Sequence, residues 1–137
     1  FEGTVMSVGR GTNLPFQIYG HPEYSEKNFS FIPLPTPGAS DPKHRGTVCY
    51  GQSLNSLLES NTGIPGIRLD FIIDAYNKTK SKEPFFKSFF TLLAGTPELQ
   101  RAIEEGQSPN QIINSWQSDI SKYKEMRKKY LLYDDFE

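Results

Sequence analysis

The chain has little of three residue types: its 137 residues include one Cys, two Met and one Trp. Because Cys49 is alone, no disulfide can form within the chain and no cysteine-based metal cluster can be built. Cys49 lies between Val48 and Tyr50 and has no assured histidine partner, so we expect a small buried side chain rather than a nucleophile. The two histidines, His21 and His44, lack the spacing of a metal-ligand motif, and we predict neither a metal nor a cofactor.

An excess of positive charge is also absent. Fifteen Lys and Arg residues face sixteen Asp and Glu residues, a formal net charge of -1. This balance argues against the broad basic field of proteins that bind nucleic acids or anionic membranes. The apolar runs, such as "FFTLLAG", are far shorter than the roughly 20 residues of a membrane-spanning helix. We therefore predict no nucleic-acid partner and no membrane-spanning segment.

The beginning of the chain lacks a start methionine, a basic n-region and an apolar h-region, so we expect a piece cut from a longer protein. Its length, with 36% hydrophobic and 23% charged residues, predicts one domain. Residues 1–65 hold most of the prolines and glycines, with β-prone stretches at 4–8, 28–34 and 46–54. Helical patterns follow from residue 65, so the predicted fold class is α+β: a strand- and loop-rich N-terminal half and a helical C-terminal half in one compact domain.

Three helical patterns occupy the first part of the C-terminal half. An apolar stripe at Leu69, Ile72, Ile73 and Tyr76 predicts an amphipathic helix starting just after "GIPG". The block "PFFKSFFTLLAG" predicts a short helix or irregular buried segment that ends at Gly95. In "TPELQRAIEEG", the order predicts Thr96 as N-cap, Pro97 at the first helical position and Gly106 at the end.

The last helix has the clearest start. In "SPNQ", Ser108 is the expected N-cap, Pro109 takes the first position, and Gln111 completes a capping box. One face then carries apolar residues over several turns, and we expect it to be mostly core. We interpret Trp116 as a packing anchor rather than a platform for a sugar. The face comprises Ile112, Ile113, Trp116, Ile120, Tyr123, Arg127, Tyr130 and Leu131.

The polar stretch "SVGRGTN" precedes any strong core segment. Gly9 and Gly11 flank Arg10, which lets the backbone adopt conformations closed to other residues and approach a ligand. The stretch is neither a P-loop nor a dinucleotide fingerprint, because the required spacing is absent. From the pattern alone, a ligand-binding loop and a tight turn whose arginine pairs with a carboxylate are equally good interpretations.

Several blocks in order carry a resemblance: "EGT", "VGRGT", "PF", "YGHP", "KHRGTVCYG", "LLAGTPELQRAIEEG" and "YLLY". Together they run from Glu2 to Tyr133 and resemble the C-terminal part of the exo-acting β-N-acetylmuramidase family, once known only as a domain of unknown function. The resemblance implies that residues 1–137 form the C-terminal domain of a larger enzyme. A Rossmann-like domain would precede it, with the active site in the cleft between the two. The family usually has Asn where this chain has Val5, which puts a role for that position in doubt.

The resemblance maps Glu2 onto the family's near-invariant active-site glutamate. Without it, Glu2 would be interpreted as an exposed residue at a frayed chain end. Glycoside hydrolysis usually uses two carboxyl groups, although the acetamido group of the substrate can replace one of them. We therefore expect the second acidic group on the missing domain.

Arg10 is the predicted contact for the lactyl carboxylate of a muramic sugar, because a guanidinium binds carboxylates bidentately. The hydroxyl groups of three further candidates can bind sugar oxygens or, equally, satisfy the backbone of the local turn. The basic loop "DPKHRG" is either part of the site or a solvated loop. These further candidates for substrate binding are Thr4, Ser7, Thr12, Lys43 and His44.

The resulting hypothesis is an exo-β-N-acetylmuramidase domain that helps to remove terminal N-acetylmuramic acid from peptidoglycan fragments. Its expected partners are the peptidoglycan-derived sugar and the missing N-terminal domain. We expect the isolated chain to be inactive, because its catalytic groups are incomplete. The resemblance also implies an exported protein, in the periplasm or at the cell surface. A stand-alone module that binds an anionic amino sugar without cleaving it is the alternative.

Overall fold

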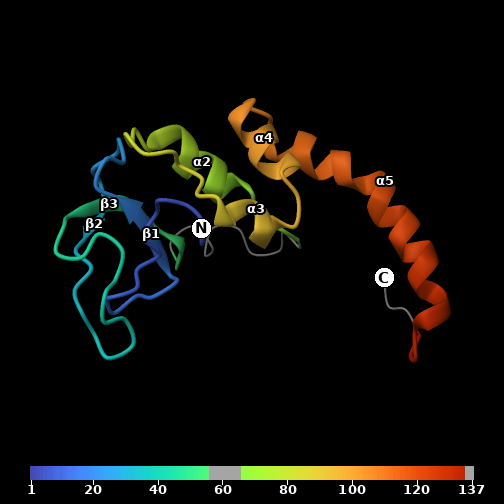
Figure 1. Ribbon diagram of the computed structural model, residues 1–137, viewed down its shortest axis with the longest axis horizontal. Helices are drawn as coiled ribbons and strands as arrows, with labels where there is room; N and C mark the ends of the chain where they lie inside the picture. Colours follow the sequence, from blue (N-terminus) through green and yellow to red (C-terminus); the bar gives the residue numbers. More distant parts are fainter. Residues whose placement is uncertain (56–65, 135–137) are drawn as a thin grey trace.

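Three short antiparallel strands lie in the described part of the proline- and glycine-rich half, residues 1–55 (Figure 1). The computed structural model describes residues 1–55 and 66–134. Strand β1 (Ile18–His21) and strand β2 (Ser30–Phe31) each pair with β3 (Cys49–Ser53), giving the order β1-β3-β2. The third strand therefore forms the centre of the sheet, and its Cys49 and Gly51 are buried.

The β-prone stretches are only partly strands. β3 lies within the predicted 46–54, whereas only two residues of 28–34 pair as β2. The predicted strand at 4–8 is wrong: Thr4 and Ser7 make isolated bridges, and positive φ at Gly3 and Gly9 bends the chain on both sides. β1 was not predicted, because its "IYGH" is short and contains a glycine; its pairing with β3 establishes it as a strand.

Within the described residues 66–134, four helices follow: α2 (Asp70–Lys78), α3 (Phe89–Ala94), α4 (Glu98–Glu104) and α5 (Pro109–Arg127), then the 3-10 turn η1 (Lys128–Tyr130). α2 begins later than predicted, and α4 begins one residue later, with Pro97 in the cap position. The Thr96 hydroxyl still accepts a hydrogen bond from Glu98 N at 3.2 Å. α3 ends at Gly95 with φ 75°, as predicted.

The capping box at the start of α5 is confirmed. Ser108 N donates to Gln111 Oε1 at 2.8 Å, and Gln111 N donates to Ser108 Oγ at 3.3 Å. These two bonds satisfy backbone groups that the first helical turn leaves unpaired.

One hydrophobic core joins the two halves of the chain. Met6 and Tyr19, from the strand-rich half, contact a cluster that includes Phe86, Phe90 and Ile112 from the helical half. Phe86 and Phe90 lie with ring centroids 4.5 Å apart. Burying each such side chain contributes about 1.5 to 3 kcal/mol. The predicted α+β class and single domain are confirmed.

A carboxylate on α2 ties that helix to the sheet. Tyr24 Oη donates to Asp74 Oδ2 at 2.6 Å, Tyr19 Oη donates to the same oxygen at 3.1 Å, and Gln52 Nε2 donates to it at 3.0 Å. Lys78 Nζ lies 2.6 Å from Asp74 Oδ1. Burial and the bond to Asp74 raise the pKa of Tyr24 to about 12, so this hydroxyl stays a donor at neutral pH. Tyr19, which these bonds fix, also lines the cavity described below.

The expectation that the long face of α5 is mostly core is wrong for its second half. Ile112 is buried, and Ile113 and Trp116 pack against the core. Beyond Trp116 the helix projects away from the rest of the molecule (Figure 1), and Tyr123 is 58% exposed. The interpretation of Trp116 as a packing anchor agrees with its contacts. Cys49 is buried as expected, and burial raises the pKa of its thiol to about 12.

Candidate functional site

The segment that follows Glu2 passes between the sheet and the helical half, and backbone hydrogen bonds hold it on both sides. On the sheet side, Ser7 exchanges two bonds with Gly20, at 2.8 and 3.0 Å. On the helical side, Val5 N donates to Phe85 O at 2.9 Å. Val5 itself is 4% exposed and belongs to the core. An apolar side chain therefore suits this position, where the resembled family usually has Asn.

Glu2 is placed by the close packing of its neighbour Gly3 against α3. Gly3 has φ +77°, and a Cβ there would lie 2.8 Å from Phe90 Cα, closer than real Cβ contacts allow. The Gly3 carbonyl accepts a hydrogen bond from Lys87 N at 2.8 Å. Only glycine fits this conformation and this space. The exposed Glu2 side chain thus starts from a fixed point of the backbone.

A loop far along the sequence holds the same segment from a third side. Lys43 Nζ donates to the Thr4 carbonyl at 2.5 Å, and His44 Nε2 lies 2.8 Å from the Val5 carbonyl. Since a carbonyl only accepts, His44 Nε2 carries a proton. The His21 ring lies edge-on to His44 with centroids 4.6 Å apart. Both predicted basic residues therefore hold the backbone of the segment that carries Glu2.

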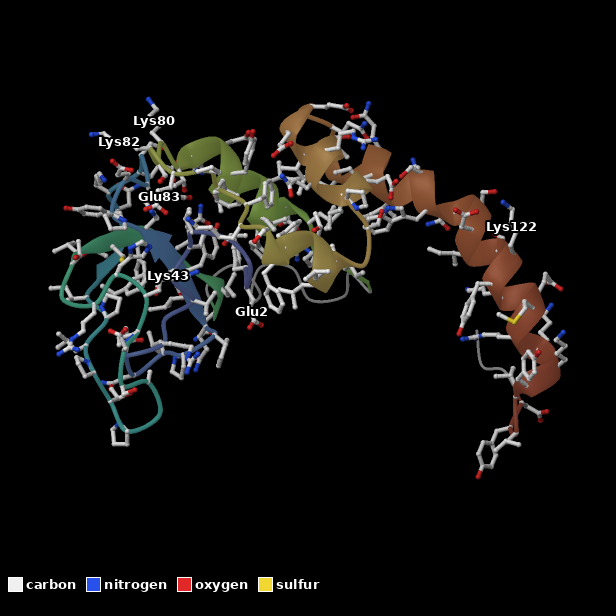
Figure 2. The ribbon with its side chains drawn as sticks, viewed as in Figure 1. Glu2, Lys43, Lys80, Lys82, Glu83 and Lys122 are labelled. Carbon is white, nitrogen blue, oxygen red and sulfur yellow. The ribbon has the colours of Figure 1, made fainter. Side chains whose placement is uncertain are left out.

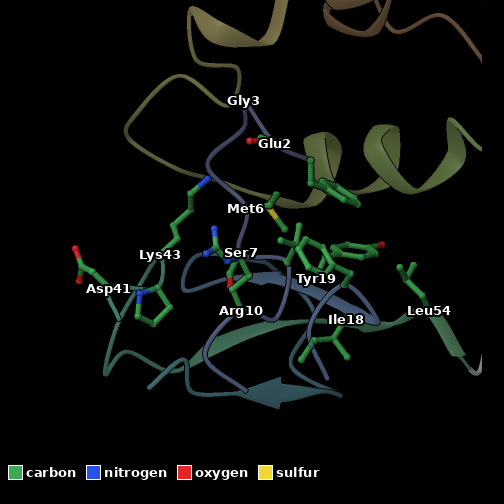
Figure 3. Close-up of a pocket in the computed structure, with 14 residues that line it drawn as sticks. Glu2, Gly3, Met6, Ser7, Arg10, Ile18, Tyr19, Asp41, Lys43 and Leu54 are labelled. Atoms are coloured by element: carbon green, nitrogen blue, oxygen red, sulfur yellow. The ribbon is translucent and has the colours of Figure 1, made fainter. Parts of the chain in front are cut away.

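The Lys43 ammonium also contributes charge near Glu2. Figure 3 shows its side chain reaching from the loop toward the backbone beside Gly3, with Glu2 just above. Desolvation there, and secondarily the nearby Lys87 ammonium, lower the pKa of Lys43, while the Glu2 carboxylate opposes this change. The Glu2 carboxylate therefore favours the charged form of Lys43.

Arg10 lies at the tip of a turn whose glycines take the predicted conformations. Gly9 and Gly11 have φ +77° and +82°. A Cβ on either residue would meet a carbonyl oxygen at 2.5 Å, that of Leu14 for Gly9 and that of Leu34 for Gly11. The guanidinium donates to a backbone carbonyl, Gly38 O, at 3.3 Å, and the residue is exposed.

A cavity of about 670 Å³ opens between the Glu2 segment, the Arg10 turn and the loop that carries Lys43 (Figure 3). It brings together four of the predicted residues. Glu2, Ser7, Arg10 and Lys43 all line it. Thr4, Thr12 and His44 are not among its lining residues.

The two threonines outside the cavity use their hydroxyl groups locally. Thr4 Oγ1 donates to Phe1 O at 2.7 Å and accepts from Met6 N at 3.2 Å. Thr12 Oγ1 donates to Gly9 O at 2.7 Å and accepts from Leu14 N at 3.0 Å. These bonds correspond to the alternative in which the hydroxyls satisfy the turn backbone.

The cavity also contains residues that the sequence analysis did not select. Tyr19 and Ile18 form an apolar wall (Figure 3). Phe16 is 68% exposed and has φ 63°, a left-handed conformation that is rare for a bulky residue. Strained backbone of this kind is found most often at functional sites. Its "PF" dipeptide was part of the resemblance, but nothing in the sequence alone indicates the strain.

Asp41 is a second carboxylate at the edge of this cavity. Its side chain is 86% exposed and lies 4.0 Å from the Arg45 guanidinium, and in Figure 3 it points away from the centre. Among the residues of this loop, only basic ones were predicted from the sequence; the alternating charges of "DPKHRG" were the signal that could have indicated Asp41.

Within residues 1–55 and 66–134, no three His, Cys, Asp or Glu side chains are grouped so that they could hold a metal ion. Over the same described ranges, no helix has both the length and the apolar character needed to cross a membrane.

Comparison with known proteins identifies the fold and the family. The family model described as "Exo-beta-N-acetylmuramidase NamZ, C-terminal" matches residues 1–133. The chain belongs to this family. Peptidoglycan beta-N-acetylmuramidase NamZ of Bacillus subtilis (strain 168) is 33% identical, over 96% of this chain and 35% of its own length. The crystal structure of a DUF1343 family protein from Bacteroides fragilis superposes with a TM-score of 0.83 and 41% identity, over 98% of this chain and 38% of that one.

The NamZ C-terminal family match confirms the resemblance found in the sequence. The chain spans about a third of the length of the curated relative. The segments that form the cavity lie within the matched residues, so the cavity is part of the domain shared with these longer relatives.

Proposed function

We propose that this chain is the C-terminal, cleft-forming domain of an exo-β-N-acetylmuramidase that removes terminal N-acetylmuramic acid from peptidoglycan fragments. The observation that carries the proposal is the presentation of Glu2 at a cavity, on a segment held from the sheet, from α3 and by Lys43. Catalytic groups need such fixed positions, because a displacement of about 1 Å can cost ~100-fold in rate. The curated relative of the same family bears the name of this activity.

Glu2 is the group proposed to act on the glycosidic bond. A carboxyl group there can exchange a proton with the glycosidic oxygen or stabilise the oxocarbenium-like transition state. The second acidic group is assigned to a preceding Rossmann-like domain that faces this cavity. Asp41 is the alternative within this chain, but its exposed carboxylate is directed toward Arg45.

Arg10 is proposed to hold the lactyl carboxylate, the group that distinguishes N-acetylmuramic acid from N-acetylglucosamine. Its guanidinium is exposed beside the cavity and now bonds only weakly, at 3.3 Å, to a carbonyl. A carboxylate would offer a shorter, charge-assisted and bidentate bond. Phe16 supplies apolar surface in the same cavity, and the Ser7 hydroxyl is the remaining polar group assigned to the sugar.

The other four predicted residues are not proposed to contact the sugar. Lys43 and His44 are assigned to positioning, because their polar atoms bond the Thr4 and Val5 carbonyls. Thr4 and Thr12 are left out, because their hydroxyls already have local partners.

A stand-alone binding module for an anionic amino sugar is the second candidate. The presence of Arg10 and an exposed aromatic ring in one cavity favours it, since these groups suffice for binding without catalysis. Either function places the protein where peptidoglycan is, and we propose an exported protein in the periplasm or at the cell surface.

The test uses the full-length protein and a chromogenic N-acetylmuramide. We expect Glu2→Gln to lower kcat by ~100-fold or more with little change in KM, because the variant keeps the shape and loses the ionisable group. Glu98→Gln on α4 is the control and should behave like the wild type. Turnover near normal in Glu2→Gln would remove Glu2 from the chemistry.

The isolated chain provides the second measurement. We expect a folded circular dichroism spectrum with no release of the chromophore, because the catalytic groups are incomplete. If the full-length protein binds the sugar and also fails to hydrolyse it, the binding module is correct. Turnover by the isolated chain would contradict the assignment of a catalytic group to another domain.

A further inference from the structure

The second half of α5 and the turn after it present an apolar face that the described part of this chain leaves uncovered. Ile120 is 39% exposed, Tyr123 58%, Tyr130 68% and Leu131 40%. This half of the helix projects from the domain, and Figure 2 shows Lys122 on it far from Glu2 and Lys43.

The exposed residues continue the face that packs in the core. With 3.6 residues per turn, Tyr123 and Tyr130 fall on the side of α5 that carries Ile112 and Trp116. Ile112 is 1% exposed, and Trp116 packs against the core. A single apolar face is therefore covered at its beginning and uncovered at its end, which distinguishes it from scattered surface hydrophobics.

Three residues of this face belong to types that are common at interfaces. Tyr, Met and Arg are enriched at protein–protein contacts, and all three occur here as Tyr123, Met126 and Arg127. Residues 119–131 contain five basic and two acidic residues. The complementary surface would be an apolar groove with an acidic rim.

We propose that this face of residues 119–131 docks on the remaining polypeptide of the full-length protein, outside residues 1–137. Two observations name this occupant rather than a second copy. The chain corresponds to 35% of the curated relative and 38% of the solved structure, so these relatives carry far more chain on which the helix could dock. The structural match extends over 98% of this chain, so nearly all of the domain, projecting helix included, has a counterpart within that longer chain.

The second half of α5 needs a packing partner for its apolar face, whatever the longer protein does. A helical stretch of this length gains little stability in water on its own, and most helices are stabilised by packing of an apolar face. Docking would supply that packing for the second half of α5. It would also orient the domain on its neighbour, and this inference does not depend on the proposed function.

The experiment is hydrogen exchange of residues 119–131 in the full-length protein, with the mass in solution measured by light scattering. We expect slow exchange in a monomer. The double variant Tyr123→Ala/Tyr130→Ala should raise the exchange rates of this segment at least tenfold. Alanine favours the helix, so faster exchange reports a lost contact rather than lost helix propensity.

The matched control is Ser118→Ala/Ser121→Ala, on the opposite face of the same helix; Ser121 lies about two and a half turns after Ile112. It should leave the exchange unchanged. Three results would overturn the proposal: fast exchange in the wild type, equal effects of the two double variants, or protection that appears only with a dimer at high concentration. The last result would identify a second copy as the occupant.

Discussion

The Lys43 ammonium donates a hydrogen bond of 2.5 Å to the carbonyl of Thr4, a residue 39 positions earlier in the chain. The bond joins the loop after β2 to the segment that carries Glu2, and both Lys43 and Glu2 line the cavity. Lys43 is thereby a positioning residue, and its removal should affect the chemistry through the backbone.

We expect Lys43→Met to lower the free energy of unfolding by about 1 to 3 kcal/mol, because a charge-assisted bond is lost and a carbonyl is left unpaired. In the full-length enzyme kcat should fall by ~10-fold or more, with a smaller change in KM. Arg45→Met is the control: Arg45 lies 4.0 Å from the exposed Asp41, and such surface pairs contribute ~0 to 1 kcal/mol. A raised KM with unchanged kcat would instead place Lys43 in contact with the sugar.

Arg10 is expected to set the preference for the muramic sugar. Arg10→Ala in the full-length protein should lower kcat/KM for a chromogenic muramide roughly 10- to 100-fold more than for the matching glucosaminide. Arg10→Lys keeps the charge and loses the bidentate geometry, so it should fall between the wild type and alanine. If alanine weakens both substrates equally, Arg10 only shapes its loop, and the segment from Lys43 to Arg45 becomes the better candidate for the lactyl contact.

Phe16 gives a test in which stability and binding change in opposite directions. Its left-handed backbone costs roughly 1 to 2 kcal/mol in a non-glycine residue, and its side chain is 68% exposed. Phe16→Gly should therefore leave the free energy of unfolding unchanged or raise it by up to ~1 kcal/mol. The same variant should weaken sugar binding several-fold in a calorimetric titration, whereas Phe16→Tyr keeps the ring and should bind normally. A clear loss of stability in Phe16→Gly would show that the ring serves the fold.

His21 should make the domain less stable in mild acid. Burial, and then the adjacent His44, lower its pKa from 6.5 to about 4. The unfolded chain takes up the proton near pH 6.5 and the folded chain only near pH 4, so the contribution is full above pH 6.5 and is lost as the pH falls toward 4. The full contribution amounts to roughly 3 kcal/mol.

Urea unfolding of the chain at pH 7 and pH 4.5 measures this effect. His21→Asn removes the titration and offers an oxygen near the position of Nδ1, which accepts from Glu23 N at 3.0 Å. Between pH 7 and pH 4.5, the free energy of unfolding should fall less in the variant than in the wild type. Equal losses in both proteins would assign the acid sensitivity to carboxylates elsewhere.

The sequence by itself determined the features that depend on neighbouring residues. The capping box of Ser108 and Gln111, the left-handed Gly95 and the paired glycines around Arg10 were all predictable, because each follows from the conformations open to a few adjacent residues. The stripe of α2 and the α+β class follow from local periodicity in the same way. The family was also recognisable from short blocks in order.

Only the tertiary structure decided which side chains share a cavity. Packing between segments far apart in the sequence brings Lys43 to the Thr4 carbonyl and encloses Thr4. The same packing places Phe16, with its left-handed backbone, among the residues that line the cavity. The periodicity of α5 likewise marked an apolar face but not what covers it. The periodicity of apolar residues along a helix shows which side tends to be buried. The residues that cover that side depend on the whole fold.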